Sequence, residues 1–141
     1  MHKQIRVDPS LSPPDVGAVL ALLAGHQINL VGAGGSNVEM GGELAIAVDH
    51  EQQDAAESLL TDAGYHFRVF DSETDPELKL CWLENEPGQL EACVAQAAEE
   101  NLVSGRKIRD ILIGVQTKDG IPVQVFSEHH GNQSDNTSTS A

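Results

Sequence analysis

The first half of the chain alternates between the hydrophobic spacing of strands and that of helices. Residues 5–7 form a short alternating segment that ends in the breaker-rich loop of residues 8–14. A helix is predicted after this loop, because apolar residues recur there at i, i+3, i+4 and i+7. These residues are Val16, Val19, Leu20 and Leu23. The apolar run 28–31 and the alternating run 44–48, which would bury one face, predict two strands.

A second helix is predicted directly after residues 44–48. Asp49 stands where a helix N-cap would be, and Gln52 follows three residues later, as in a capping box. The apolar stripe of this helix consists of Ala56, Leu59, Leu60 and Ala63. Alternation at residues 65–70 predicts one more strand. The predicted order is therefore strand, helix, strand, strand, helix, strand.

The second half of the chain begins the same pattern again. Residues 78–83 alternate, a turn follows, and a helical stripe comes next. The stripe consists of Leu90, Cys93, Val94 and Ala97, each 74 residues (90 minus 16 for the first) after its counterpart in the first helix. Strands are predicted at residues 108–117 and 121–128, with the hairpin signal Asp119-Gly120 between them. The pattern is thus an internal repeat.

This order predicts an α+β fold: a ferredoxin-like βαββαβ sandwich followed by a shortened βαββ repeat, with antiparallel sheets that carry helices on one face. The predicted units are residues 3–71 and 77–128, and the polar residues 129–141 are predicted to be a disordered tail. The shortened repeat would leave part of its sheet uncovered, and natural proteins rarely leave such edges open. Both faces of residues 78–83 are apolar, so self-association is the economical way to cover them.

One motif carries a family resemblance. It is Asn85-Glu86-Pro87-Gly88-Gln89-Leu90, which follows a predicted strand and precedes a predicted helix. It resembles the Asn-x-Pro-Gly-x-Leu turn that typically follows the first strand of an ACT domain. The first copy matches less well, with Pro14 where the family has glycine, although Ile28-Asn29-Leu30 resembles the family's second-strand entry. The resemblance covers residues 3–128 and implies a regulatory module that binds an amino acid or similar metabolite.

The residues of this turn offer a physical basis for binding a zwitterion. Pro87 fixes φ at the first turn of the helix, and Gly88 lets a ligand approach the backbone. The N–H groups of Gly88, Gln89 and Leu90 lie at the partially positive helix N-terminus, which suits a carboxylate. Asn85 and Asn29 could each offer a carbonyl oxygen to an ammonium group.

The predicted ligand-binding residues therefore come from two segments. They are Asn85, Glu86, Pro87, Gly88, Gln89, Leu90, Ile28, Asn29 and Leu30. The alternative that stays open is that Asn85 to Gly88 form only a strand-to-helix turn, because Asn, Pro and Gly are the usual turn residues.

Composition excludes several classes of partner. The chain has 141 residues, enough for one medium domain or two small ones. Its 22 acidic and 8 basic residues give a net charge of −14, which argues against nucleic acid and against anionic membranes as partners. No apolar run is long enough to cross a membrane, and residues 1–8 lack the apolar centre of a signal peptide. We therefore expect a cytoplasmic protein.

The sequence offers little catalytic or metal-binding chemistry. Cys81 and Cys93 are predicted to be free thiols in a reducing compartment and to pack as small hydrophobic residues. The glycines of residues 32–35 follow a strand as in a dinucleotide loop, but no helix follows, so they are predicted to bend or bulge the strand. Adjacent His129 and His130 suit a metal site poorly. We predict no cofactor, no metal and no enzymatic activity.

Two functions follow from these observations. The first is a non-enzymatic ACT-type regulatory protein that binds an amino acid or related metabolite, forms a homodimer and acts through a separate enzyme or regulator. The alternative is a structural or adaptor module that docks onto a protein without a ligand. A small enzyme on the same sandwich would need a pocket with clustered carboxylates or histidines.

Overall fold

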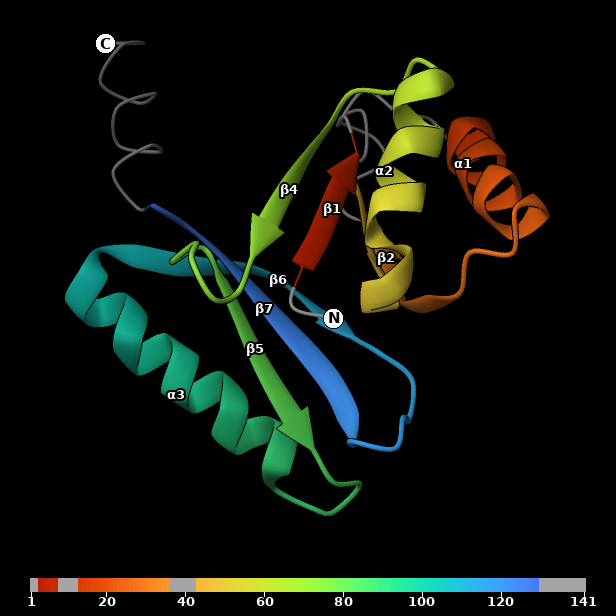
Figure 1. Cartoon of the computed structure of the whole chain (residues 1–141). Helices are drawn as coiled ribbons and strands as arrows, with labels where there is room; N and C mark the ends of the chain where they lie inside the picture. The colour runs from red at the N-terminus through yellow and green to blue at the C-terminus, as the bar shows by residue number, and fades with distance from the viewer. Residues whose placement is uncertain (1–2, 8–12, 36–42, 130–141) are drawn as a thin grey trace, which may run out of the picture. The chain divides into compact units, whose positions relative to one another are not determined.

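A computed structural model gives the structure of this chain and describes residues 3–7, 13–35 and 43–129 (Figure 1). The chain divides into two compact units, Met1–Glu73 and Thr74–Ala141. His129 ends a strand, and the rest of the predicted disordered tail lies outside the described residues.

The first unit is a complete βαββαβ sandwich, as predicted. Its elements are β1 (Lys3–Val7), α1 (Pro13–Gly25), β2 (Leu30–Gly35), β3 (Leu44–Val48), the short 3-10 helix η2 (His50–Gln52), α2 (Gln53–Asp62) and β4 (Phe67–Asp71). The strands pair antiparallel in the order β2-β3-β1-β4. Figure 1 shows α1 and α2 side by side on one face of this sheet.

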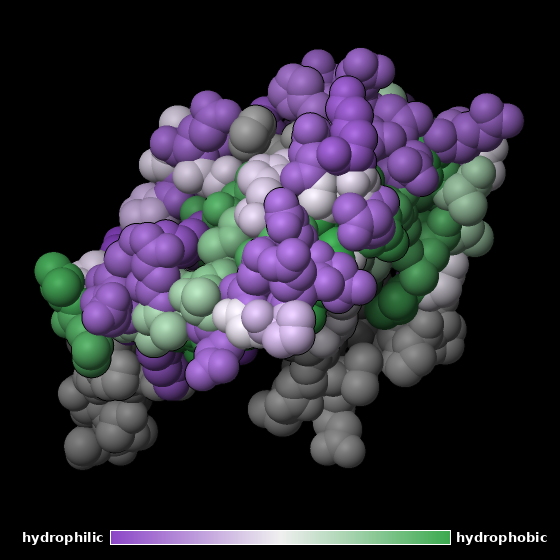
Figure 2. Space-filling model, turned by 90° about the horizontal axis from the view of Figure 1, so that it is seen from below, coloured by the Kyte–Doolittle hydropathy of each residue, from purple (hydrophilic) through white to green (hydrophobic). Residues whose placement is uncertain are grey.

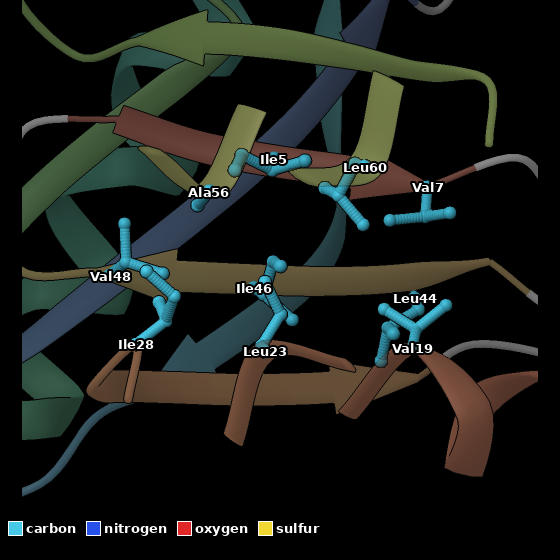
Figure 3. Packing of buried hydrophobic residues seen from close by; sticks show 10 residues of the cluster. All are labelled: Ile5, Val7, Val19, Leu23, Ile28, Leu44, Ile46, Val48, Ala56 and Leu60. Carbon is cyan, nitrogen blue, oxygen red and sulfur yellow. The ribbon is translucent and has the colours of Figure 1, made fainter. Parts of the chain in front are cut away.

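The core of the first unit lies between the sheet and its two helices. The stripe predicted for α1 is confirmed, because Val19 and Leu23 are fully buried in it. Figure 3 shows side chains from β1, β3, α1 and α2 converging in one layer. The buried cluster consists of Ile5, Val7, Val19, Leu23, Ile28, Leu44, Ile46, Val48, Ala56 and Leu60.

The opposite face of this sheet carries a buried charge network. The Arg6 guanidinium donates through Nε to Glu43 Oε1 at 2.7 Å and through NH1 to Gln4 Oε1 at 2.7 Å. Arg68 also reaches Glu43 Oε2 at 3.1 Å. Ala45 lies opposite Arg6 in the ladder, so β3 is buried on both faces rather than on the one that its alternation predicts.

Two local predictions in the first unit have different outcomes. The glycines after residue 31 belong to β2, and a register shift between Leu30 and Gly32 confirms the predicted irregularity. The predicted capping box is wrong: Asp49 is the N-cap of η2, but its side chain makes no capping hydrogen bond. The Asp49 carboxylate accepts a hydrogen bond from Asn29 instead, because the sheet brings β2 beside β3.

The second unit is the predicted shortened repeat. Its elements are β5 (Leu78–Leu83), α3 (Gln89–Ser104), β6 (Arg106–Ile113) and β7 (Ile121–His129). The strands pair antiparallel in the order β5-β7-β6, and Figure 1 shows α3 along one face. The α+β, ferredoxin-like fold class is therefore confirmed.

The helices of the two units bury corresponding positions. Cys93 and Ala97 of α3 are 5% and 3% exposed, and their counterparts in α1, Val19 and Leu23, are fully buried. The buried cluster of the second unit consists of Cys93, Ala97, Val123 and Val125, with Cys81, Leu83 and Ile108 packed against it. The repeat seen in the sequence is therefore also a repeat in packing.

The strand β6 ends four residues earlier than predicted, at residue 113 and not at residue 117. The turn that follows closes with a bridge between Thr117 and Gly120. Gly120 has φ +117°, and a Cβ built there would lie 2.7 Å from the carbonyl oxygen of Leu83. Only glycine fits this position, so the predicted glycine-containing hairpin is confirmed.

No helix within the described part of the chain combines the length and the hydropathy that a membrane span requires.

Candidate functional site

The predicted Asn85 to Leu90 motif forms the connection from β5 to α3. Gly88 is the N-cap of α3 and has φ +85°, a conformation that favours glycine, and no side chain caps this helix end. Pro87 lies in the turn before the helix and not in its first turn as predicted, because the N-cap falls at Gly88. The backbone conformation alone therefore accounts for glycine at this position. Gly88 is consistent both with a simple strand-to-helix turn and with a ligand-binding turn.

The helix start leaves backbone donors at the turn. In an α-helix the first N–H groups have no carbonyl acceptor within the helix, which here concerns Gln89, Leu90 and Glu91. The Gln89 N–H makes only a long contact of 3.5 Å to the Glu86 carbonyl oxygen. A Cβ placed on Gly88 would meet no atom within 4 Å, so open space lies beside the N-cap. This geometry can accept a carboxylate.

The Gln89 side chain has a positioning role inside the turn. Its Oε1 accepts a hydrogen bond from the Glu84 N–H at 2.6 Å, and its Nε2 donates to Glu86 Oε2 at 3.4 Å. These bonds hold the entry and exit of the turn together. The Gln89 side chain therefore holds the loop in place, which is a structural role for one of the predicted ligand-binding residues.

Acidic side chains surround the turn. Glu84, Glu86 and Glu91 are all exposed, as is Asn85. A free anion would meet their repulsion, whereas the ammonium group of a zwitterion would be attracted to them. The local charges therefore favour a ligand with both signs over a simple carboxylate.

A disulfide frames the turn, and the sequence prediction of two free thiols is wrong. Cys81 in β5 and Cys93 in α3 are bonded, with a Cα–Cα distance of 6.4 Å, within the usual range for disulfides. The helix packs on the strand and brings together residues separated by 12 positions. Cys81 was predicted on a strand and Cys93 on the apolar stripe of the next helix, but this spacing does not show that the two sulfur atoms are adjacent.

The second predicted segment, Ile28 to Leu30, lies in the first unit. Ile28 belongs to the buried cluster, and Leu30 packs against it. The Asn29 N–H donates to Gln52 Oε1 at 2.7 Å, and its Nδ2 donates to Asp49 Oδ2 at 3.0 Å. These two bonds do not use the Asn29 side-chain oxygen. The two predicted segments lie in different units, and each is a candidate by itself.

One further hollow lies along α2. It measures about 450 Å³ and is lined by Asp54, Glu57, Ser58, Thr61 and Asp62. All of these residues come from a single helix. Within the described ranges, no three histidine, cysteine or acidic side chains are grouped so that they could hold a metal ion. The residues that line the hollow include three carboxylates but no basic side chain.

Comparison with known proteins identifies the fold. No protein-family model matches the sequence, and no curated protein matches it. The crystal structure of protein BT0572 from Bacteroides thetaiotaomicron matches with a TM-score of 0.62 and 18% identity, over 92% of this chain and 81% of that one. The ligand-free regulatory subunit of aspartate kinase from Thermus thermophilus matches with a TM-score of 0.54 and 16% identity, over 88% of this chain and 82% of that one. At such identities the likeness concerns the fold.

Proposed function

We propose that this protein is an ACT-type regulatory module that binds an amino acid or a related small metabolite and acts through a separate partner protein. The observation that carries the proposal is the match to a regulatory subunit of aspartate kinase over 88% of the chain. An alignment of that extent is longer than either unit, which supports a tandem of two ACT-like units, residues 3–71 and 77–128. The proposal includes a cytoplasmic, non-enzymatic homodimer.

The β5–α3 turn supports the ligand part of the proposal. Backbone donors at the start of α3 suit a carboxylate, and exposed Glu84, Glu86 and Glu91 suit an ammonium group nearby. Asn85 is exposed beside them and carries both a donor and an acceptor. An α-amino acid presents these two charges a few ångströms apart, so it is the ligand class that this turn fits best.

A thermal-shift screen of the twenty amino acids, each added alone, tests the ligand. A molecule that binds only the folded protein adds about 2.7 kcal/mol to the free energy of unfolding when its concentration is a hundred times its Kd. The melting temperature rises as a result. We expect at least one amino acid to raise the melting temperature. No shift with any of them at millimolar concentration would refute the proposed ligand class.

A matched pair of glycine variants tests the position of the site. Gly88 and Gly105 begin and end the same helix, both with positive φ and with no atom within 4 Å of a built Cβ. Gly88→Ala and Gly105→Ala should each cost about 1 kcal/mol of stability through backbone strain. Only Gly88→Ala should also abolish the thermal shift given by the amino acid found in the screen. Equal responses of the two variants would place the ligand elsewhere.

A second candidate function is an adaptor that docks onto a protein without a ligand. The observation that favours it is a set of exposed apolar side chains in the second unit, and Figure 2 shows hydrophobic groups between hydrophilic ones on the face seen from below. Leu102 and Val103 at the end of α3 are 85% and 91% exposed. Co-purification of a partner enzyme together with a negative ligand screen would favour this function.

A further inference from the structure

The Cys81–Cys93 disulfide encloses the whole β5–α3 turn. Cys81 lies in β5, and Cys93 lies in the second turn of α3, so Asn85 to Leu90 all fall inside the loop that the bond closes. A cross-link of this kind restricts the conformations open to the residues between its ends. The order of the candidate ligand site is therefore coupled to the state of two sulfur atoms.

The buried non-covalent contacts of the same loop lie at its two ends. Leu83 at the end of β5 pairs with Ile121 of β7, and Cys93 packs in the buried cluster of the second unit. Between these contacts residues 84–88 are exposed. The Gln89 side chain bonds to Glu84 and Glu86 in this interval, and such exposed bonds open easily.

The two cysteines of the disulfide differ in burial. Cys81 is half-buried, whereas Cys93 is only 5% exposed. A thiolate of a dithiol reductant can attack the Cys81 sulfur, which breaks the S–S bond and releases Cys93 as a thiolate that takes up a proton. The second thiol of the reductant then attacks the mixed disulfide and releases Cys81 as a thiol. The protein gains two electrons and two protons, and the reductant becomes a cyclic disulfide.

We propose that Cys81 and Cys93 form a redox-sensitive clasp on the β5–α3 turn. The disulfide holds the turn ordered and ready for a ligand, and the dithiol form releases it. In a reducing compartment, disulfides are typically transient and serve redox sensing or catalysis. The consequence for ligand binding rests on the proposed function, whereas the release of the turn does not.

Amide hydrogen exchange of the full, ligand-free chain tests the clasp. The reporters are the amides of Glu84 and Ala92, which bond to Gln89 Oε1 and to the Gly88 carbonyl oxygen. After reduction with excess dithiothreitol, we expect both to exchange about tenfold faster or more, because closure of a loop of this size restrains its opening by at least that factor. The Gly105 amide, bonded to Asn101 at the far end of α3, is the control. It should be unchanged, because an amide at a helix end exchanges by local fraying, which the disulfide does not restrain.

A double variant provides an independent reading. Cys81→Ser/Cys93→Ser should exchange like the reduced protein and should not respond to dithiothreitol. If this variant does not fold, the reduced natural chain alone decides. Three results would each overturn the proposal: unchanged exchange at Glu84 and Ala92, an equal increase at Gly105, or a disulfide that persists in excess dithiothreitol.

The ligand screen separates the clasp from the proposed function. Faster exchange on reduction with no amino-acid hit refutes the ligand and leaves the clasp. A hit whose thermal shift is the same in oxidised and reduced protein, with unchanged exchange, refutes the clasp and leaves the ligand. If both hold, the shift given by that amino acid should decrease on reduction.

Discussion

The two units repeat one pattern but complete it to different extents. The first unit has two helices on a sheet of four strands, and its core cluster contains ten fully or nearly buried residues. The second has one helix on three strands, and its core cluster contains four. Hydrophobic burial is the main favourable term in folding, so the larger core cluster should stabilise the first unit more than the smaller one stabilises the second.

The second unit differs in two further ways. Every large hydrophobic residue that is exposed among those the structure describes belongs to it: Trp82, Leu90, Leu102, Val103, Ile111, Ile113 and Val115. It also contains the disulfide between its strand β5 and its helix. Small folds that cannot bury enough apolar surface often rely on such a cross-link, so the disulfide supplements a small core.

The ion pairs of the two units also differ in burial. In the first unit, Arg6 and Glu43 form an ion pair whose side chains are 1% and 3% exposed. In the second unit, Lys79 pairs with Glu100 near the surface, with side chains 26% and 56% exposed. Exposed pairs contribute little to stability, whereas the loss of one partner of a buried pair is costly.

The largest effect is expected from the core of the first unit. Leu60→Ala removes a fully buried side chain and should lower the free energy of unfolding by about 2–5 kcal/mol. Leu59→Ala on the same helix is the control and should cost less, because Leu59 is only partly buried. Urea titration followed by far-UV circular dichroism measures both values.

The same titration tests whether the two units unfold independently. Trp82 is the only tryptophan and lies in the second unit, so its fluorescence reports on that unit. If the units unfold independently, Leu60→Ala should leave the Trp82 transition in place. An equal shift of both signals would mean that the units unfold as one.

An intermediate effect is expected from the disulfide. Cys81→Ala/Cys93→Ala should lower the stability of the second unit by about 2–4 kcal/mol, because the open chain regains conformational freedom between the two positions. The Trp82 fluorescence transition in urea measures the loss, and dithiothreitol added to the natural chain should reproduce it. A loss below about 0.5 kcal/mol would show that the small core suffices by itself.

The smallest effect on stability is expected at the exposed end of α3. Leu102→Ser and Val103→Ser should change the free energy of unfolding by about 0.5 kcal/mol or less, because both side chains are exposed. If this end of α3 contributes to self-association, both variants should elute later than the natural chain in gel filtration. Unchanged elution would exclude it from the interface.

Hydrophobic spacing predicted most of the fold because it reports which face of each element is buried. The spacing predicted the apolar stripe of α1 and its repeat in α3. Val19 and Cys93, at corresponding positions of the two stripes, are both buried. The spacing could not show side-chain partners. Asp49 and Gln52 have the spacing of a capping box, yet the side chain of each bonds to Asn29, the residue before β2.

The candidate site was predictable as a segment but not as a geometry. The Pro87-Gly88 pair indicated a turn before a helix, and the structure has that turn. Its backbone conformation at Gly88 and the internal bonds of Gln89 depend on how β5 and α3 pack. They are therefore absent from any pattern along the chain.

Local hydrophobic spacing was enough to predict the order of elements, the repeat and the faces that enter each core, because all three depend on which side chains are buried. The pairing of Cys81 with Cys93 and of Arg6 with Glu43 depends on the packing of segments that are distant in sequence. The paired residues are 12 and 37 positions apart in sequence. Contacts of this kind form only when packing fixes the distance between elements, which no local spacing encodes.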